Sequence, residues 1–269
     1  MPALSEFLSQ RAVFTTGQLE AFLSERGSGN RNTQKALLAY YRKRGRIRPL
    51  RRGLYAVVPP GSSTESVTVD PYLVAASVSE DAVLGYHTAL EFHGRAYSVF
   101  RRLYVVTAVK FAPFRFGAYE FRRAPAPRPL LAKGKQMFGV VRRERSGVEI
   151  RVTNLERTLV DVLARPELGG GWEEAWRSLE SVEFFDLEAV VEYVWLLGNA
   201  TTAAKVGFFL DQHREALMVP EEILERLRAL RPKQPHYMER RRRRNCRWVK
   251  EWNLMAPEEI LNRSWGEVL

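Results

Sequence analysis

The sequence predicts an α+β protein with more than one domain. Three features support this. Apolar residues follow helical spacing up to about residue 44, short β-branched runs occur between residues 47 and 152, and helical spacing returns from about residue 155. The 269 residues suit two or three domains with a sizeable core. A single cysteine, Cys246, excludes an intrachain disulfide framework and a cysteine-rich zinc site.

The N-terminal part of the chain, up to Pro60, predicts three helices followed by a β-hairpin. A short helix over Leu4–Ser9 precedes a second one that begins at Thr16, the expected N-cap, and stops at Gly27. A third helix runs to about Arg44. Two extended runs follow between residues 47 and 58, separated by a tight turn at Gly53. This order of elements is that of a winged helix-turn-helix, a DNA-binding module.

The charge distribution favours a nucleic-acid partner for the same region. The formal net charge is +11 and the isoelectric point about 10.0. Residues 1–58 contain 11 basic and 3 acidic side chains, whereas residues 151–235 contain 10 and 15. Such asymmetry indicates a nucleic-acid module joined to a part with a different role.

A helical wheel predicts how the third helix is oriented. With Thr33 as reference, Leu37, Tyr40 and Arg44 fall together, near Ala36, and form the expected core-facing stripe. The opposite side is cationic and consists of Arg31, Lys35, Leu38 and Arg42, with Gln34 at its edge. In a major groove, Arg reads guanine, and Asn or Gln reads adenine. A three-helix unit with a merely solvated basic face remains the alternative.

The hairpin arginines are expected to lie on phosphates or to enter a minor groove. In the third helix, Asn32 has a second interpretation as an N-cap. The predicted DNA-binding residues are Arg31, Asn32, Gln34, Lys35, Arg42, Arg48, Arg51 and Arg52.

Beyond the hairpin, the stretch Pro59–Ser63 predicts a linker, so the expected domains are 1–59 and 65–269. Helices are expected over 70–79 and 84–92, and strands over 103–109, 119–123, 138–142 and 148–152, with a proline-rich loop over 124–129. From about residue 155 the chain is expected to be helical, over 155–163, 172–181, 187–197, 202–213 and 220–230.

Three stretches resemble the AbiEi antitoxin family, in the same order and between about positions 10 and 175. The first is the hairpin, Leu50-Arg51-Arg52-Gly53-Leu54-Tyr55. The second reads Tyr86-His87-Thr88-Ala89-Leu90-Glu91-Phe92-His93-Gly94. The third reads Val152-Thr153-Asn154-Leu155-Glu156-Arg157-Thr158-Leu159-Val160-Asp161 and continues to Pro166, Gly169 and Gly170. Beyond about position 175 the chain matches only loosely.

The resemblance implies a transcriptional repressor that regulates its own operon. The family consists of antitoxins of type IV toxin–antitoxin systems, which act in phage defence by abortive infection. Its N-terminal winged helix binds operator DNA, often inverted repeats, and its larger C-terminal part relieves the toxicity of a nucleotidyltransferase toxin. A stable complex with the toxin is not required.

Other candidate sites favour structural roles. His87 and His93, six apart, do not share a helix face and make a poor metal pair. Glu156 and Asp161 suit capping or ion-pair roles. A nuclease-like middle domain is an alternative, although the strand around Glu120 offers no second acid. The sequence therefore predicts a protein that is not an enzyme, with no catalytic residue, metal or cofactor.

An arginine-rich run near the C-terminus is a possible second basic patch, made of Arg240, Arg241, Arg242, Arg243, Arg244 and Arg247. It suits either a second phosphate contact or charge balance with the acidic 151–235 region, and Trp248 and Trp252 are expected to anchor a helix there. Nonspecific nucleic-acid binding is a further alternative function. Without a signal sequence or a membrane-spanning run, a cytoplasmic location is expected.

Overall fold

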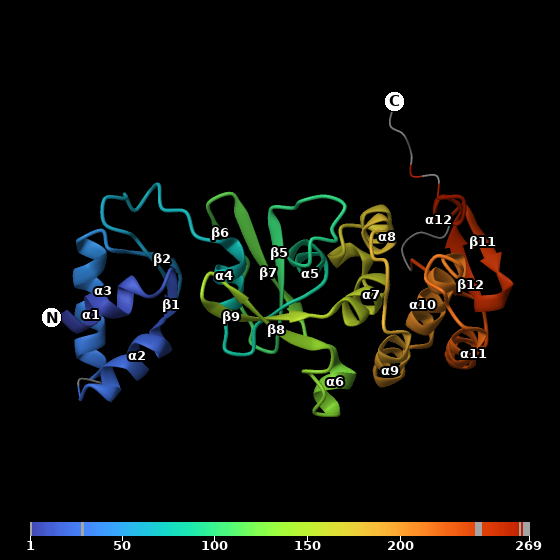
Figure 1. Ribbon diagram of the computed structural model, residues 1–269, viewed down its shortest axis with the longest axis horizontal. Helices are drawn as coiled ribbons and strands as arrows, with labels where there is room; N and C mark the ends of the chain where they lie inside the picture. The colour runs from blue at the N-terminus through green and yellow to red at the C-terminus, as the bar shows by residue number, and fades with distance from the viewer. Residues whose placement is uncertain (1, 28–29, 240–243, 264, 266–269) are drawn as a thin grey trace. The chain divides into compact units, whose positions relative to one another are not determined.

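The computed structural model describes residues 2–27, 30–239, 244–263 and 265, and it confirms the α+β class (Figure 1). Contacts divide the chain into two units. Unit 1 comprises residues 1–84, 101–123 and 142–151, and unit 2 comprises residues 85–100, 124–141 and 152–269. The units interleave in sequence, whereas the predicted organisation has a single boundary between residues 59 and 65.

The N-terminal part of unit 1 contains the three predicted helices and the predicted hairpin. The elements are α1 (Pro2–Ser9), β1 (Val13–Thr15), α2 (Thr16–Glu25), α3 (Arg31–Lys43), β2 (Ile47–Arg51) and β3 (Leu54–Val57). The strands form an antiparallel sheet in the order β1-β3-β2. Strand β1 was not predicted, because so short a run is insufficient to show a strand pattern.

Local hydrogen bonds explain where α2 and α3 begin. Helix α2 starts with a capping box, in which Thr15 Oγ1 accepts from the Gln18 backbone and Gln18 Oε1 accepts from the Thr15 backbone. Asn30 caps α3 by accepting from the Asn32 backbone N–H at 2.9 Å. The expected caps at Thr16 and Asn32 are therefore wrong by one and two positions.

A Schellman arrangement ends α3 and turns the chain into the hairpin. Gly45 has φ +66°, its N–H donates to Arg42 O, and the Arg46 N–H donates to Tyr41 O. The core beneath these elements is apolar and consists of Leu4, Phe7, Leu8, Phe14, Leu19, Leu23, Tyr41, Ile47 and Val57.

A six-stranded sheet follows, in the order β6-β7-β5-β4-β9-β8. Its elements, with the preceding helix, are α4 (Pro71–Ala76), β4 (Val83–Leu84), β5 (Arg102–Thr107), β6 (Phe114–Phe116), β7 (Tyr119–Pro125), β8 (Val140–Arg145) and β9 (Val148–Thr153). The four predicted strands are present, and β4 and β6 were not predicted. The helix expected over 84–92 begins only at residue 87, because Val83 and Leu84 pair with β5.

Unit 2 is mainly helical, as expected from residue 155 onward. Its helices are α5 (His87–Phe92), α6 (Arg128–Ala132), α7 (Leu155–Ala164), α8 (Trp172–Glu180), α9 (Leu187–Leu197), α10 (Ala200–Gln212), α11 (Glu221–Leu230) and α12 (Glu258–Leu261), with 3₁₀ turns η1 (Pro166–Leu168) and η2 (Lys250–Trp252). The predicted proline-rich loop is shorter than expected, since β7 ends at Pro125 and α6 begins at Arg128.

The C-terminal segment differs from the expected helix. It forms a small sheet in the order β10-β12-β11, from β10 (His236–Tyr237), β11 (Cys246–Val249) and β12 (Leu254–Pro257). Trp252 is fully buried, as predicted, and its Nε1 donates to Asp211 at 3.0 Å. Trp248 is 53% exposed, so it is not the second anchor. Among the described helices, none is long and apolar enough to cross a bilayer.

Candidate nucleic-acid interface

Helix α3 is oriented differently from the predicted wheel (α3 in Figure 1). Gln34 and Tyr41 are its buried residues, with the two leucines between them partly buried. Tyr40, expected in the core, is 42% exposed, and the Arg44 guanidinium lies 4.8 Å from the centre of its ring. The error arises because Leu37-Leu38 and Tyr40-Tyr41 are adjacent apolar pairs. A wheel can be centred on either member of each pair, and only tertiary packing selects one.

Gln34 therefore has a structural role and is not a base-reading residue. Its side chain is 8% exposed, and Nε2 donates to the Thr16 carbonyl at 2.6 Å. This bond joins the first turn of α3 to the start of α2. A buried amide held in this way stabilises the angle between the two helices, and its burial keeps it away from a base edge.

The outward face of α3 lies opposite Gln34 and Tyr41. Because of the helical repeat, the positions there are Asn32, Ala36, Ala39 and Lys43, all exposed. Arg31, Lys35 and Arg42 form an exposed cationic flank beside them. Ala36, expected near the core-facing stripe, is exposed instead, and with Ala39 it leaves the helix backbone uncovered, so another surface can approach it closely. The sequence feature that could have identified this face is the repeat of a small residue among cationic ones.

Two of the hairpin arginines, Arg48 and Arg51, make contacts inside unit 1. Arg48 donates to the carbonyls of Thr64 and Glu65 at 2.9 and 3.2 Å, and it lies over the Phe116 ring at 5.1 Å. The other is Arg51, which donates to the Val78 carbonyl at 3.3 Å.

Two phenylalanine rings complete the surroundings of Arg51. Its guanidinium lies 5.0 Å from the ring centre of Phe111 and 5.8 Å from that of Phe114. Burial lowers the pKa of Arg51, although a guanidinium stays charged at any ordinary pH. Arg48 and Arg51 thus have internal partners in this structure, and their predicted phosphate-contacting role stays a prediction.

Arg52 remains exposed at the tip of the hairpin. The turn is tight, with Gly53 at φ +80°, and its carbonyl accepts from the Thr16 N–H at 2.9 Å. A Cβ on Gly53 would lie 3.3 Å from Thr16 Oγ1, so the backbone conformation favours glycine and the space for a side chain is tight. The hairpin tip is therefore held against the first residue of α2.

The possible second patch is described only in part. Arg240–Arg243 lie outside the described residues. Arg244 and Arg247 are exposed, and Arg247 stands on strand β11. Their role as a phosphate contact or as charge balance stays a prediction.

The second sequence motif forms a buried polar cluster in unit 2. The fully buried His87 has its Nε2 2.9 Å from a Glu174 oxygen and its Nδ1 3.2 Å from a Glu91 oxygen. Its ring stacks on Phe100, with centroids 4.1 Å apart. His93 lies 2.8 Å from the Thr153 carbonyl. Both histidines are held by polar partners inside unit 2, the structural role that was predicted, although the Glu91 approach to His87 Nδ1 does not have hydrogen-bond geometry.

The third motif forms a buried ion pair on α7. Arg157 and Asp161 approach to 3.4 Å, and Tyr193 on α9 donates to Asp161 at 2.7 Å. Arg157 also donates to the carbonyls of Gln136 and Phe138. Burial raises the pKa of Asp161. The ion-pair role predicted for Asp161 is confirmed.

Glu156, the other acid in the third motif, caps a neighbouring segment. It accepts a hydrogen bond from the Asp186 backbone N–H at 3.2 Å, at the start of α9. The prediction of a capping role is therefore also confirmed. The second and third motifs both serve to hold unit 2 together.

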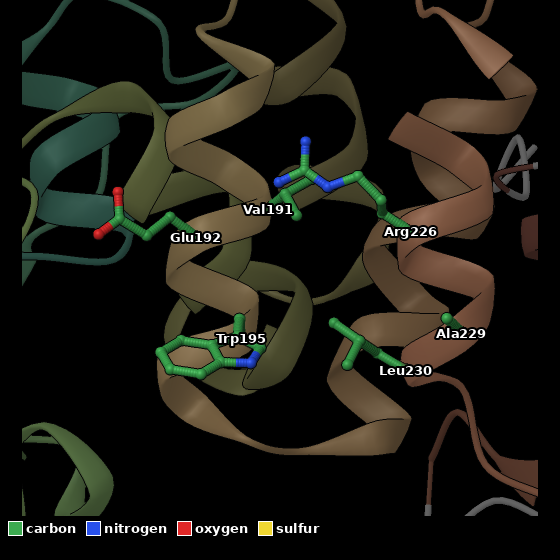
Figure 2. A pocket seen from close by; sticks show the side chains of 6 residues that line it. All are labelled: Val191, Glu192, Trp195, Arg226, Ala229 and Leu230. Carbon is green, nitrogen blue, oxygen red and sulfur yellow. The ribbon is translucent and has the colours of Figure 1, made fainter. Parts of the chain in front are cut away.

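An apolar groove lies between α9 and α11 in unit 2 (Figure 2). Val191 and Trp195 line one side and Leu230 the other, around a volume of about 360 Å³. Trp195 is 61% exposed, and the Lys133 ammonium lies 5.1 Å from its ring centre. Arg226 at the rim is held by both carboxylate oxygens of Glu188.

The described residues contain no cluster of three or more His, Cys, Asp or Glu side chains placed to hold a metal ion.

No protein-family model and no curated protein matches the chain. A solved structure does: the crystal structure of the RV2827C protein from Mycobacterium tuberculosis has a TM-score of 0.60 and 19% sequence identity, over 98% of this chain and 94% of that chain. At this identity the likeness shows a shared fold.

Proposed function

We propose that the chain is a sequence-specific DNA-binding repressor, in which the segment 1–58 is a winged helix-turn-helix with α3 as the recognition helix. The observation that carries the proposal is the exposed face of α3. Asn32 lies in the first turn of this face, the short side chains of Ala36 and Ala39 occupy its centre, and exposed cations lie along its flank. A recognition helix needs a polar reader in its first turns, room for the groove floor, and positive charge toward the phosphates.

The surrounding elements support the same proposal. Helix α2 and the hairpin both hold α3 in place, through the Gln34–Thr16 and Gly53–Thr16 bonds. Rigid presentation matters because a helix that reads bases must keep its register to within a fraction of an ångström. Of the originally selected DNA-binding residues, the proposal keeps Arg31, Asn32, Lys35, Arg42 and Arg52.

The resemblance to AbiEi antitoxins extends the proposal to a biological role. The repressor would regulate its own toxin–antitoxin operon, bind double-stranded operator DNA with inverted repeats, and protect the cell from a nucleotidyltransferase toxin. The motifs that carry this resemblance in unit 2 form buried clusters around His87 and Arg157. Distant relatives are expected to share residues that stabilise the fold. The buried position of these motifs therefore supports a common architecture between this chain and the AbiEi antitoxins.

The test uses the double-stranded promoter region upstream of the chain's own gene. Asn32→Ala should weaken binding by about 1–3 kcal/mol and relax the preference at one base position. Ala36→Glu should abolish specific binding, because it places a carboxylate at the centre of the interface. Ala21→Glu adds the same charge to an exposed position of α2 and is the matched control. Gel-shift affinities that are unchanged for Ala36→Glu would contradict the proposal.

The antitoxin role has a separate test. The full chain, co-expressed with a neighbouring nucleotidyltransferase gene placed under an independent promoter, should restore growth. The Ala36→Glu variant should also restore growth if unit 2 relieves toxicity without DNA. Growth arrest with both proteins would overturn the antitoxin role and leave DNA binding untouched.

A further inference from the structure

The whole net charge of the protein lies in unit 1. Unit 1 contains 21 basic and 10 acidic residues, and unit 2 contains 21 of each. The excess is not confined to the helices and hairpin at the N-terminus. Residues 101–123 add six basic side chains and a single acid, Glu120, which is paired with Arg102 and Arg122. Apart from Arg102 and Arg122, the cations of this stretch make no ion pair with any residue in the described part of the chain.

One of these cations is displayed on a firmly held segment. Residues 108–113 connect β5 to β6 and form the β5–β6 loop. Asp81 fixes its start, accepting from Thr107 Oγ1 at 2.5 Å and from the Ala108 N–H at 2.7 Å. Arg123 donates to the carbonyls of the same two residues at 3.2 and 3.1 Å.

The far end of the β5–β6 loop is joined to the DNA-binding hairpin. Phe111 and Phe114 receive the guanidinium of Arg51, which immediately precedes the exposed Arg52 at the hairpin tip. Lys110, the residue before Phe111, is exposed and makes no ion pair among the described residues. The loop is therefore fixed at both ends, and its one lysine adjoins the phenylalanine that contacts the hairpin.

We propose that the β5–β6 loop is a second DNA-backbone contact, with Lys110 as a phosphate-binding residue that acts beside Arg52. This proposal rests on the proposed DNA-binding function. The hairpin itself is short and offers only Arg52, because Arg48 and Arg51 are engaged internally. The loop extends the contact surface past the tip of the hairpin. Its partner is the phosphate backbone of the duplex outside the bases that α3 reads.

The chain offers a matched control for Lys110 in Arg115. Both side chains are exposed and each carries one positive charge. Arg115 lies between Phe114 and Phe116, whose rings face the hairpin arginines, so on an extended strand its side chain points to the opposite face. Removing either residue lowers the net charge equally, but Arg115 is on the strand face turned away from the hairpin arginines, whereas Lys110 adjoins the phenylalanine that contacts Arg51.

The experiment measures the salt dependence of binding of the full chain to the promoter duplex and to a duplex of mixed sequence. Lys110→Ala should reduce the slope of log affinity against log salt by about 1 on both duplexes, with base preference unchanged. Arg115→Ala should leave the slope as in the wild type. Phe111→Ala keeps every charge but frees the loop, so it should also lower the slope, whereas Phe111→Tyr should not.

The outcomes separate the two proposals. If the wild type binds neither duplex, the DNA-binding function itself fails. If it binds and Lys110→Ala has the wild-type slope, only the β5–β6 contact is overturned. Equal losses for Lys110→Ala and Arg115→Ala would also overturn it, since they would show an effect of total charge. A loss for Lys110→Ala alone supports the contact.

Discussion

Gln34 shows how one side chain can be assigned opposite roles by sequence and by structure. In the sequence it stands among cations in the first half of a candidate recognition helix, where an amide is a typical adenine reader. In the structure its amide is buried and bonded to the Thr16 carbonyl. Amides suit both tasks because they donate and accept in either setting. Only burial distinguishes them, and burial depends on which face of the helix packs inward.

The two roles predict different results for Gln34→Ala. Loss of a buried hydrogen bond should lower the free energy of unfolding by about 1–3 kcal/mol, since the Thr16 carbonyl is left without this donor. Base preference should stay as in the wild type. Asn32→Ala should show the reverse pattern, because its side chain is exposed. Urea unfolding and a panel of mutated duplexes measure both properties. A changed base preference in Gln34→Ala with unchanged stability would restore the reading role.

Among the elements, those with a long run in one pattern were predicted and the short ones were not. The helices over Leu187–Leu197 and Glu221–Leu230 carry several turns of apolar spacing, so their positions were expected. Strands β1, β4 and β6 are too short to show any period. Their existence depends on partners elsewhere in the chain. For β1, that partner is β3, from which it is separated in sequence by α2, α3 and β2.

The surface proposed to face DNA was predicted only where the evidence lies within a few residues of sequence. That Asn32 and the neighbouring cations are exposed follows from a polar stripe on an amphipathic helix. That Arg48 and Arg51 are engaged does not, because their ring partners Phe111 and Phe116 come only after β5, far along the chain from the hairpin. From the sequence alone, an arginine-rich turn indicates a phosphate contact, because the aromatic rings that pack against its arginines cannot be identified.

At the scale of elements, the hairpin turn predicts a contrast between two glycines. Gly53→Ala should destabilise the protein by about 1–2 kcal/mol, because the residue has φ +80° and its Cβ would crowd Thr16. Gly17→Ala, in α2, should instead stabilise it by about 0.5 kcal/mol. There φ is ordinary, the nearest atom to a Cβ is 3.8 Å away, and alanine favours a helix. Thermal unfolding of the two variants measures the contrast. Equal effects would show that the turn is not held as described.

For the whole molecule, the arginine–phenylalanine contacts decide whether residues 1–58 form an independent domain. The exposed stretch Pro59–Ser63 has the composition of a linker, and the predicted boundary lies there. Yet Arg48 bonds to Thr64 and Glu65 just beyond it, and Arg51 reaches Val78 and the β5–β6 loop. Contacts on both sides of a linker make the flanking parts unfold together. Residues 1–58 and the sheet of unit 1 should therefore behave as one cooperative body.

Amide hydrogen exchange tests this cooperativity. The double variant Arg48→Ala with Arg51→Ala removes the contacts, so amides of α2 and α3 should lose protection while those of unit 2 keep theirs. A loss of about 1–3 kcal/mol in opening free energy is expected, from the cation–π contacts and the hydrogen bonds to the Thr64 and Val78 carbonyls.

The matched control is Arg52→Ala, which removes the same kind of charge from the next residue, where the side chain is exposed. Its α2 and α3 amides should exchange as in the wild type. Equal protection in the double variant and the wild type would mean that residues 1–58 fold without help from the sheet. The linker at 59–63 would then be a true domain boundary, and the hairpin arginines would be free to leave their rings and bind phosphate. Coupled exchange would instead show that Arg48 and Arg51 connect the β5–β6 loop to residues 1–58, which include α3, the proposed recognition helix.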